Sequence, residues 1–375
     1  MKFQLALFVF GVLAFTTSQP VNDEDLTDVI EAEVEDDQLW EIPQIDGSFK
    51  WMTEQEAKDR TLKTELIEKA KWVVKHFSNK RRKVRFFLYT QRNPSKWQEI
   101  DMERPETLQR SNFNSSHPTR IFAHGWLGGV HAPQTIEIVD SHLANGRNEN
   151  YNIIIADWSV WSMTVNYYLA RLRTRKAGAK TAELIDWLHE NTGMPFETLH
   201  VFGHSLGAHV AGFTGKQVTK GKIKTIIGLD PAMPLFRLKN PHNRLAETDA
   251  EYVETLHTNG LKLGFFNPIG KAAFYPNGGR KQPGCKRDYH GGCAHLLAPT
   301  YLAEAIAKGY GNSFYSIKCD SFEAMKKRQC SDFDEEIRMG DPENYKKAEG
   351  VYFLETYPFA PFGMGDRYIK ERLGL

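Results

Sequence analysis

The run Gly203-His204-Ser205-Leu206-Gly207 places a serine between two glycines, a spacing that can present a hydroxyl nucleophile. It lies between an apolar stretch at 199–202 and a helical pattern at 206–218. A sharp strand-to-helix turn needs small flanking residues so that the backbone can close while the serine stays exposed. The five-residue pattern alone arises by chance in roughly one chain in ten of this length. Its position between a strand and a helix is therefore what predicts a nucleophile.

A serine nucleophile needs an orienting carboxylate and a base, and in this architecture they follow the serine in that order along the chain. Asp230 directly follows the next apolar stretch, 225–229, where a charge is costly unless it is paired. Four histidines come later in the chain: His242, His257, His290 and His295. The first lies in a polar, proline-containing loop and the second in a strand-like run. The last two therefore remain the candidates for the base.

Acyl transfer also needs two N–H donors aimed at the oxyanion that develops on the substrate. One is expected from the residue after the nucleophile, Leu206. The other is expected from an earlier loop at a strand end, and the run RIFAHGWLGG, with His124, Gly125 and Trp126, follows an apolar stretch in the right place. We expect the His124 ring to support this loop rather than to act in catalysis.

The segment GCKRDYHGGCAH, residues 284–295, brings two cysteines and two histidines together. Cys285, His290, Cys293 and His295 could offer four ligands to zinc, which prefers thiolate and imidazole. A disulfide is the alternative, and the cellular compartment distinguishes the two. Export permits disulfides, whereas reducing compartments favour metal-binding thiols.

The N-terminus indicates export. Residues 1–18 combine Lys2, an apolar run of 13 residues and a small-residue end, as in a secretory signal peptide. A membrane span needs roughly 20 apolar residues, so an anchor is the weaker interpretation. Residues 19–50 are strongly acidic at their start and predict a flexible leader or propeptide. A single sequon makes Asn114 a candidate glycosylation site in an exported protein.

Composition and periodicity predict one soluble α/β domain at 51–375. The 41% hydrophobic content is ordinary for a globular protein, and the net charge of +1 argues against nucleic-acid binding. Short apolar stretches alternate with helical patterns, which predicts a mostly parallel sheet with helices on both faces. The basic run at 80–85 could bind heparin-like polymers or anionic membranes, although a solvated strand entrance is favoured.

Longer motifs resemble the animal neutral lipases of the pancreatic lipase family, especially insect secreted members and phospholipases A1. The matching stretches are FFLYTQRNP, IFAHGW, IIIADW, VFGHSLGAHVAGFTGK, IIGLDPA, DAEYVETLHT, FYPNGGRKQPGC and GVYFLETYPFAPF. The resemblance implies an α/β-hydrolase fold with Ser205 as nucleophile, Asp230 as orienting acid and His295 as base. It further implies oxyanion N–H groups from Trp126 and Leu206. Disulfides are implied for the pairs Cys285 with Cys293 and Cys319 with Cys330.

Three departures from the family pattern shape the functional expectation. The loop between Cys285 and Cys293, which corresponds to the family's lid, holds only seven residues, and 258–274 also looks shortened, as in phospholipase A1 members. The C-terminal β-sandwich domain of pancreatic-type lipases is expected to be absent. The calcium loop, 243–249, has Ala246 at one acidic position, so we expect no metal and no cofactor.

These features predict a secreted serine hydrolase that cleaves fatty-acyl esters of glycerolipids at a lipid surface. The short lid favours phospholipids or galactolipids, but some short-lid relatives are triacylglycerol lipases, so both remain open. Insect yolk proteins share the family pattern as storage or lipid-binding proteins and form the non-enzymatic alternative. A serine peptidase or small-ester esterase would share the triad but not the paired-cysteine lid.

Overall fold

The computed structural model describes residues 38–44, 48–60, 83–143, 150–307 and 313–365, with 370 and 374. The expected signal peptide and the acidic part of the leader lie outside these residues. A compact unit runs from Leu39 to Leu375. Within it, β1 (Trp40–Pro43) pairs with β2 (Phe49–Met52) in a hairpin that buries Trp40, Ile42 and Met52. These apolar side chains join the core of the same unit that contains the domain predicted at 51–375.

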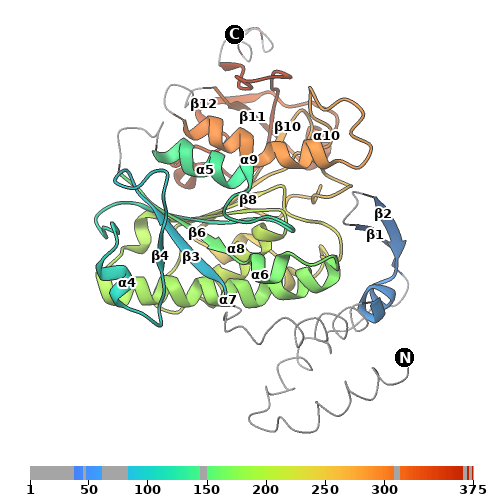
Figure 1. Ribbon diagram of the computed structural model, residues 1–375. Helices are drawn as coiled ribbons and strands as arrows, with labels where there is room; N and C mark the ends of the chain where they lie inside the picture. Colours follow the sequence, from blue (N-terminus) through green and yellow to red (C-terminus); the bar gives the residue numbers. More distant parts are fainter. Residues whose placement is uncertain are drawn as a thin grey trace, which may run out of the picture. The chain divides into compact units, whose positions relative to one another are not determined.

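A large sheet forms the centre of this unit, with helices on both faces (Figure 1). Its strand order is β12-β11-β13-β10-β9-β8-β7-β5-β6-β3-β4. The strands are β3 (Arg85–Tyr89), β4 (Gln98–Ile100), β5 (Thr119–Ala123), β6 (Asn152–Asp157), β7 (Leu199–His204), β8 (Thr225–Leu229), β9 (Tyr252–Leu256), β10 (Ala272–Pro276), β11 (Tyr315–Cys319), β12 (Asp332–Arg338) and β13 (Gly350–Leu354). Helices whose bounds lie within the described residues are α4 (Glu106–Gln109), α5 (Pro133–Leu143), α6 (Ser159–Ser162), α7 (Tyr167–Thr192), α8 (Leu206–Gln217), α9 (Gly292–Ile306) and α10 (Phe322–Lys326).

The central strands are parallel, and antiparallel pairs occur toward the two edges. β6, β5, β7, β8, β9, β10 and β13 pair in parallel, whereas β3, β4, β11 and β12 join antiparallel. Successive strand residues face opposite sides, so Ile154 packs in the cluster with α7 and α8 while Ile153 and Ile155 pack with α5 and α9. The expected mostly parallel sheet with helices on both faces is confirmed. Parallel pairing also brings the carboxyl ends of β5, β7 and β8 to one edge of the sheet.

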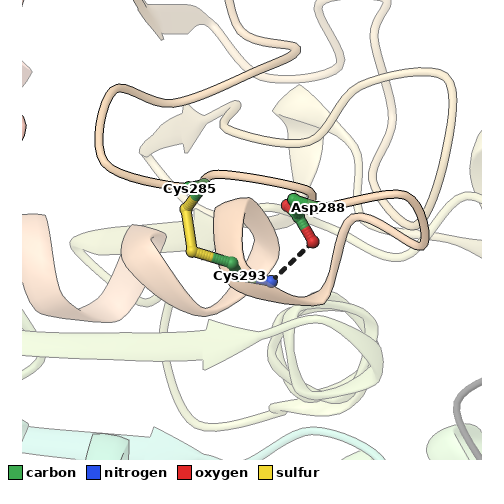
Figure 2. A group of neighbouring side chains, drawn as sticks. All are labelled: Cys285, Asp288 and Cys293. Carbon is green, nitrogen blue, oxygen red and sulfur yellow. Dashed lines mark hydrogen bonds between the residues drawn. A yellow bond between two sulfur atoms is a disulfide. The ribbon is translucent and has the colours of Figure 1, made fainter.

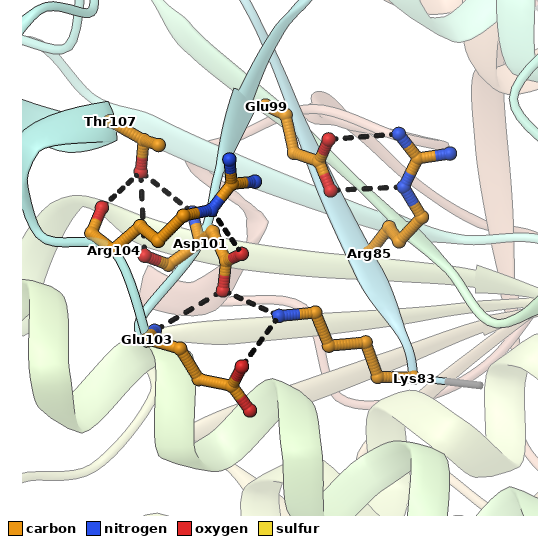
Figure 3. A network of polar contacts seen from close by, with 7 residues as sticks. All are labelled: Lys83, Arg85, Glu99, Asp101, Glu103, Arg104 and Thr107. Atoms are coloured by element: carbon orange, nitrogen blue, oxygen red, sulfur yellow. Dashed lines mark hydrogen bonds and ion pairs between the residues drawn. The ribbon is translucent and has the colours of Figure 1, made fainter. Parts of the chain in front are cut away.

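Ion pairs close the β3–β4 edge of the sheet (Figure 3). Arg85 donates two hydrogen bonds to Glu99, at 2.9 and 2.8 Å. The buried Asp101 accepts from Lys83 Nζ at 2.7 Å and Arg104 Nε at 2.9 Å. Burial alone would raise the pKa of Asp101, but these bonds outweigh it and lower the pKa. Lys83 and Arg85 thus neutralise acids at the start of β3, which favours a solvated strand entrance over a binding patch for the basic run. Residues 80–82 of that run lie outside the described residues.

Buried neutral histidines should make the fold sensitive to acid. Burial lowers the pKa of five of them: His142, His200, His204, His209 and His257. For His142 and His209 the pKa falls to about 3. An unfolded histidine titrates near pH 6.5, so below that pH the unfolded chain binds protons that the folded chain does not. Each such group then removes about 1.4 kcal/mol of stability per pH unit.

Glu254 opposes this trend, because burial raises its pKa to about 7 and the folded state gains its proton first as the pH falls. Between pH 7.5 and 5.5 the five histidines and Glu254 together lower the free energy of unfolding by at most about 5 kcal/mol. We expect urea unfolding to show a free energy of unfolding several kcal/mol lower at pH 5.5 than at pH 7.5. An equal or higher value at pH 5.5 would show that these histidines are not buried neutral.

Candidate active site

Ser205 lies on a strained turn between β7 and α8. Its φ of 58° and ψ of −122° belong to a region that non-glycine residues rarely adopt, at a cost of about 1–3 kcal/mol. The backbone is fixed on both sides, since Ser205 N donates to Leu229 O at 3.0 Å and Ala232 N donates to Ser205 O at 3.2 Å. Such strain persists where the surrounding structure enforces it, and it places the serine side chain at the carboxyl end of a strand.

The flanking glycines are needed for close approach rather than for an unusual φ of their own. A Cβ on Gly203 would lie 2.1 Å from the carbonyl oxygen of Gly207. A Cβ on Gly207 would lie 2.0 Å from the carbonyl oxygen of Ala123 at the end of β5. The predicted need for small residues at these two positions therefore has a steric cause, because α8 starts in direct contact with β7 and β5.

Asp230 and His295 form a buried hydrogen-bonded pair. His295 Nδ1 lies 2.5 Å from Asp230 Oδ2, and the two side chains are 9% and 0% exposed. The other carboxylate oxygen, Oδ1, accepts from the backbone N–H of Thr258 at 2.8 Å and of Asn259 at 3.0 Å. Three donors therefore fix the carboxylate, and the carboxylate fixes the orientation of the imidazole.

The histidine of this pair packs beside the serine turn. The His204 and His295 rings have centroids 4.6 Å apart, and His204 Nε2 lies 3.1 Å from the carbonyl oxygen of His295. Burial lowers the pKa of His204 well below its usual value, and the nearby His295 lowers it further. His204 is therefore a neutral support next to Ser205. The structure thus brings Ser205, Asp230 and His295 to one site, whereas His242 and His257 contact other parts of the chain.

The loop after β5 lies against Ser205. A Cβ on Gly125 would be 3.0 Å from Ser205 Cβ, which places Gly125, the residue before Trp126, against the serine side chain. Trp126 Nε1 donates to the carbonyl oxygen of Thr164 at 2.8 Å and holds the loop. Leu206 is the first residue of α8, and the first N–H groups of a helix have no acceptor within it. Both predicted oxyanion donors thus belong to backbone next to the serine.

His124 supports this loop from behind, as expected. Its Nε2 lies 3.0 Å from Asp157 Oδ1 and its Nδ1 lies 2.9 Å from the carbonyl oxygen of Gly125. Burial raises the pKa of Asp157, but the bonds from His124 and Ser159 more than offset it and the pKa is lowered. The site therefore contains two buried histidine–carboxylate pairs. In the pair of His295 with Asp230, the histidine lies in the first turn of α9 and the acid directly follows β8.

Comparison with known protein families identifies the family of this chain. A family model described as Lipase matches residues 49–362. The chain belongs to the lipase family. The predicted resemblance to pancreatic lipases is confirmed, and the sheet described above is an α/β-hydrolase fold.

The chain is similar to several mammalian lipases. Pancreatic lipase-related protein 2 of Rattus norvegicus is 33% identical over 274 residues, which cover 67% of this chain and 57% of the rat protein. Hepatic triacylglycerol lipase of Rattus norvegicus is 38% identical over 210 residues, 54% of this chain and 42% of that protein. Pancreatic triacylglycerol lipase of Cavia porcellus is 32% identical over 269 residues, 66% and 56% respectively. This lipase-family chain spans about half the length of the curated relatives it matches.

The structure joins Cys285 to Cys293 in a disulfide at the start of α9 (Figure 2). Sulfur atoms bonded to each other are not thiolates, so the four-ligand zinc interpretation does not hold. Asp288 lies within 4.8 Å of both sulfurs, but its carboxylate accepts from the N–H of Cys293 at 3.1 Å and of Ala294 at 2.9 Å. It therefore caps the first turn of the helix that carries His295.

Two further contacts hold this short loop. The exposed His290 ring stacks on Phe49 of β2, with centroids 5.6 Å apart, and the carbonyl oxygen of Tyr289 accepts from Lys262 Nζ. The loop is thus fixed by a disulfide, a helix cap, a ring contact and a lysine. Tyr289 is 74% exposed, so the loop presents one large aromatic side chain to solvent.

The remaining predicted sites lie outside this cluster. Cys319 at the end of β11 forms a disulfide with Cys330 after α10. Asn114 is exposed, and its Oδ1 accepts from Ser116 N at 3.0 Å and from Ser116 Oγ at 2.8 Å. The sequon therefore forms an accessible turn of the kind that suits a glycan acceptor.

Proposed function

We propose that this chain is a serine hydrolase that cleaves fatty-acyl esters of glycerolipids. The observation that carries the proposal is the buried Asp230–His295 pair beside the strained Ser205 turn. A strained serine next to an oriented imidazole is the arrangement that activates a hydroxyl nucleophile. Membership of the lipase family supports esters of fatty acids as the substrates.

The reaction proceeds through an acyl-enzyme. His295 takes the proton of Ser205 Oγ as the oxygen attacks the ester carbonyl, and Asp230 stabilises the imidazolium that forms. The backbone N–H groups of Trp126 and Leu206 bind the oxyanion, and the departing alcohol takes the proton from His295. Water activated by the same histidine then attacks the acyl-enzyme and releases the fatty acid.

The fixed, short Cys285–Cys293 loop supports an open groove that needs no oil interface for activation. Its small size leaves space for a polar head group, so phospholipids and galactolipids hydrolysed at their first acyl position are proposed substrates beside acylglycerols. A side-by-side assay on phosphatidylcholine vesicles and emulsified triolein tests which of these lipids is hydrolysed.

A second assay tests the open groove with dissolved short-chain esters. We expect them to be hydrolysed at an undiminished rate below the concentration at which they aggregate. A sharp rise in rate only above that concentration would contradict the open groove.

Export is part of this proposal. Two disulfides are typical of proteins that fold in an oxidising compartment. Among the described residues, no helix is long and apolar enough to cross a membrane. The N-terminal residues 1–18 supply the proposed signal peptide.

Removing the Cys285–Cys293 disulfide with two serine substitutions should lower both stability and kcat. The loop-closure model assigns about 2–3 kcal/mol to a disulfide of this length. Because His295 lies two residues beyond Cys293, loosening the loop should also misplace the base, and we expect kcat to fall about tenfold. Thermal unfolding and ester hydrolysis measure the two effects.

The matched control is the Cys319→Ser, Cys330→Ser double variant, whose loop is of similar length but lies away from the site. It should lose a similar stability with kcat unchanged at a temperature where both variants are folded. Equal kcat values for the two double variants would contradict a positioning role of the first disulfide.

A further inference from the structure

The segment 243–249, which the family resemblance implies as a calcium loop, packs closely on α8. It contains the end of one short 3-10 turn, η2 (Pro241–Asn243), and all of another, η3 (Glu247–Asp249). A Cβ on Gly212 would lie 2.7 Å from Leu245 Cα, and one on Gly215 would lie 2.0 Å from the carbonyl oxygen of Asp249. Two helix glycines therefore allow the segment to lie directly on the helix that follows Ser205.

The segment holds two carboxylates, of which Glu247 is exposed and Asp249 is already paired. Asp249 is buried, and its Oδ1 accepts from Lys216 Nζ at the last turn of α8. Its Oδ2 accepts from the backbone N–H of Ala246 at 2.9 Å. The Asp249 side chain is 1% exposed and the Lys216 side chain 21%, so the carboxylate is removed from water and the ammonium only partly so.

The neighbouring carbonyl oxygens are also occupied by a protein cation. The Arg244 guanidinium donates to the carbonyl oxygens of Arg237 at 3.2 Å, Leu238 at 2.6 Å and Leu245 at 2.7 Å. Calcium takes six to eight oxygen ligands, including carboxylates and carbonyls. Here these oxygens face N–H donors, and the methyl group of Ala246 offers none. The residues present therefore do not fit a calcium ion.

We infer that the Lys216 ammonium, together with the Arg244 guanidinium, replaces a metal ion as the cation that holds segment 243–249 on α8. The link continues toward the active site. Leu245 N donates to His209 Nδ1 at 3.0 Å, and His209 Nε2 lies 2.7 Å from the carbonyl oxygen of Ala232, two residues after Asp230. The segment that Lys216 holds is thus connected to the loop that starts at the orienting acid. This inference concerns stability and does not depend on the proposed reaction.

Thermal unfolding tests it through the Lys216→Met variant, which keeps the alkyl stem and removes the charge. Breaking a buried pair leaves a buried carboxylate unpaired, and we expect Tm to fall by about 5 °C or more. The Lys216→Met, Asp249→Asn double variant removes both charges and keeps an oxygen for Ala246 N, so it should recover much of that loss. Lys220→Ala, which breaks the exposed pair with Glu190, is the control and should change Tm by about 1 °C at most.

The second measurement uses the unmodified protein, so it remains informative if Lys216→Met does not fold. Its Tm should be the same within error in excess EDTA and in millimolar calcium chloride. A Tm that falls in EDTA and recovers with calcium would overturn the inference. A Lys216→Met variant as stable as Lys220→Ala, or a double variant no more stable than Lys216→Met, would also overturn it.

Discussion

The Ser205→Ala variant should lose at least three orders of magnitude in kcat for ester hydrolysis while keeping its fold. Removing the nucleophile of a serine, histidine and carboxylate set typically costs about 10⁶ in kcat, and the remainder comes from the oxyanion donors and binding. The Ser205 side chain forms no cap hydrogen bond to α8, and alanine keeps the Cβ of the serine. Initial rates on a soluble fatty-acyl ester, with circular dichroism to verify folding, provide the measurement.

Ser141→Ala is the matched control for this variant. Ser141 is also buried, and its Oγ donates to the carbonyl oxygen of Ile138 within α5. Its removal should cost some stability and leave kcat within a factor of about two. A Ser205→Ala protein that hydrolyses the ester as fast as Ser141→Ala would exclude Ser205 as nucleophile and favour a lipid-binding role.

Replacing Asp230 by asparagine should lower kcat by about 10⁴ at neutral pH. Thr258 and Asn259 donate to Oδ1, so the carbonyl oxygen of the new amide must stay on that side. The amide NH₂ then faces His295 Nδ1, which has to become an acceptor. The imidazole is forced to carry its proton on Nε2, the nitrogen that must accept the serine proton. Geometry is kept, but the base is in the wrong tautomer.

Asp157→Asn provides the control, because Asp157 is the other carboxylate that is hydrogen-bonded to a histidine in the site. It should reduce stability and change kcat by less than about tenfold, since His124 supports a loop. If Asp157→Asn lowers kcat as much as Asp230→Asn, the assignment of Asp230 as the orienting acid is wrong.

The site elements could be predicted because local sequence determines them. A strand, a glycine-flanked serine and a helix define the turn at Ser205, and an apolar stretch followed by a lone acid defines the end of β8. Parallel pairing then brings both to the same edge of the sheet. The sequence pattern alone does not decide whether His290 or His295 is the base, because that choice depends on where the disulfide loop directs α9.

Contacts between distant segments could not be predicted. The two backbone donors to Asp230 come from residues 258 and 259, and only the pairing of β8 with β9 places them beside it. The acidic stretch before the hairpin predicts a flexible leader up to residue 50, yet Trp40 and Ile42 of the hairpin pack in the core. The sequence around Lys216 does not indicate a partner for this lysine, because Asp249 lies in a distant segment that only the fold brings next to it.

Covalent labelling by a fluorophosphonate tests the central claim most directly, because the probe reacts with activated serines and not with ordinary ones. Folded protein is incubated with the probe, digested and mapped by mass spectrometry. We predict one label per chain, located on Ser205, with labelling lost in Ser205→Ala and strongly slowed in Asp230→Asn. Folded protein that takes up no label, or that is labelled on another serine and remains so in Ser205→Ala, would contradict a serine hydrolase centred on Ser205.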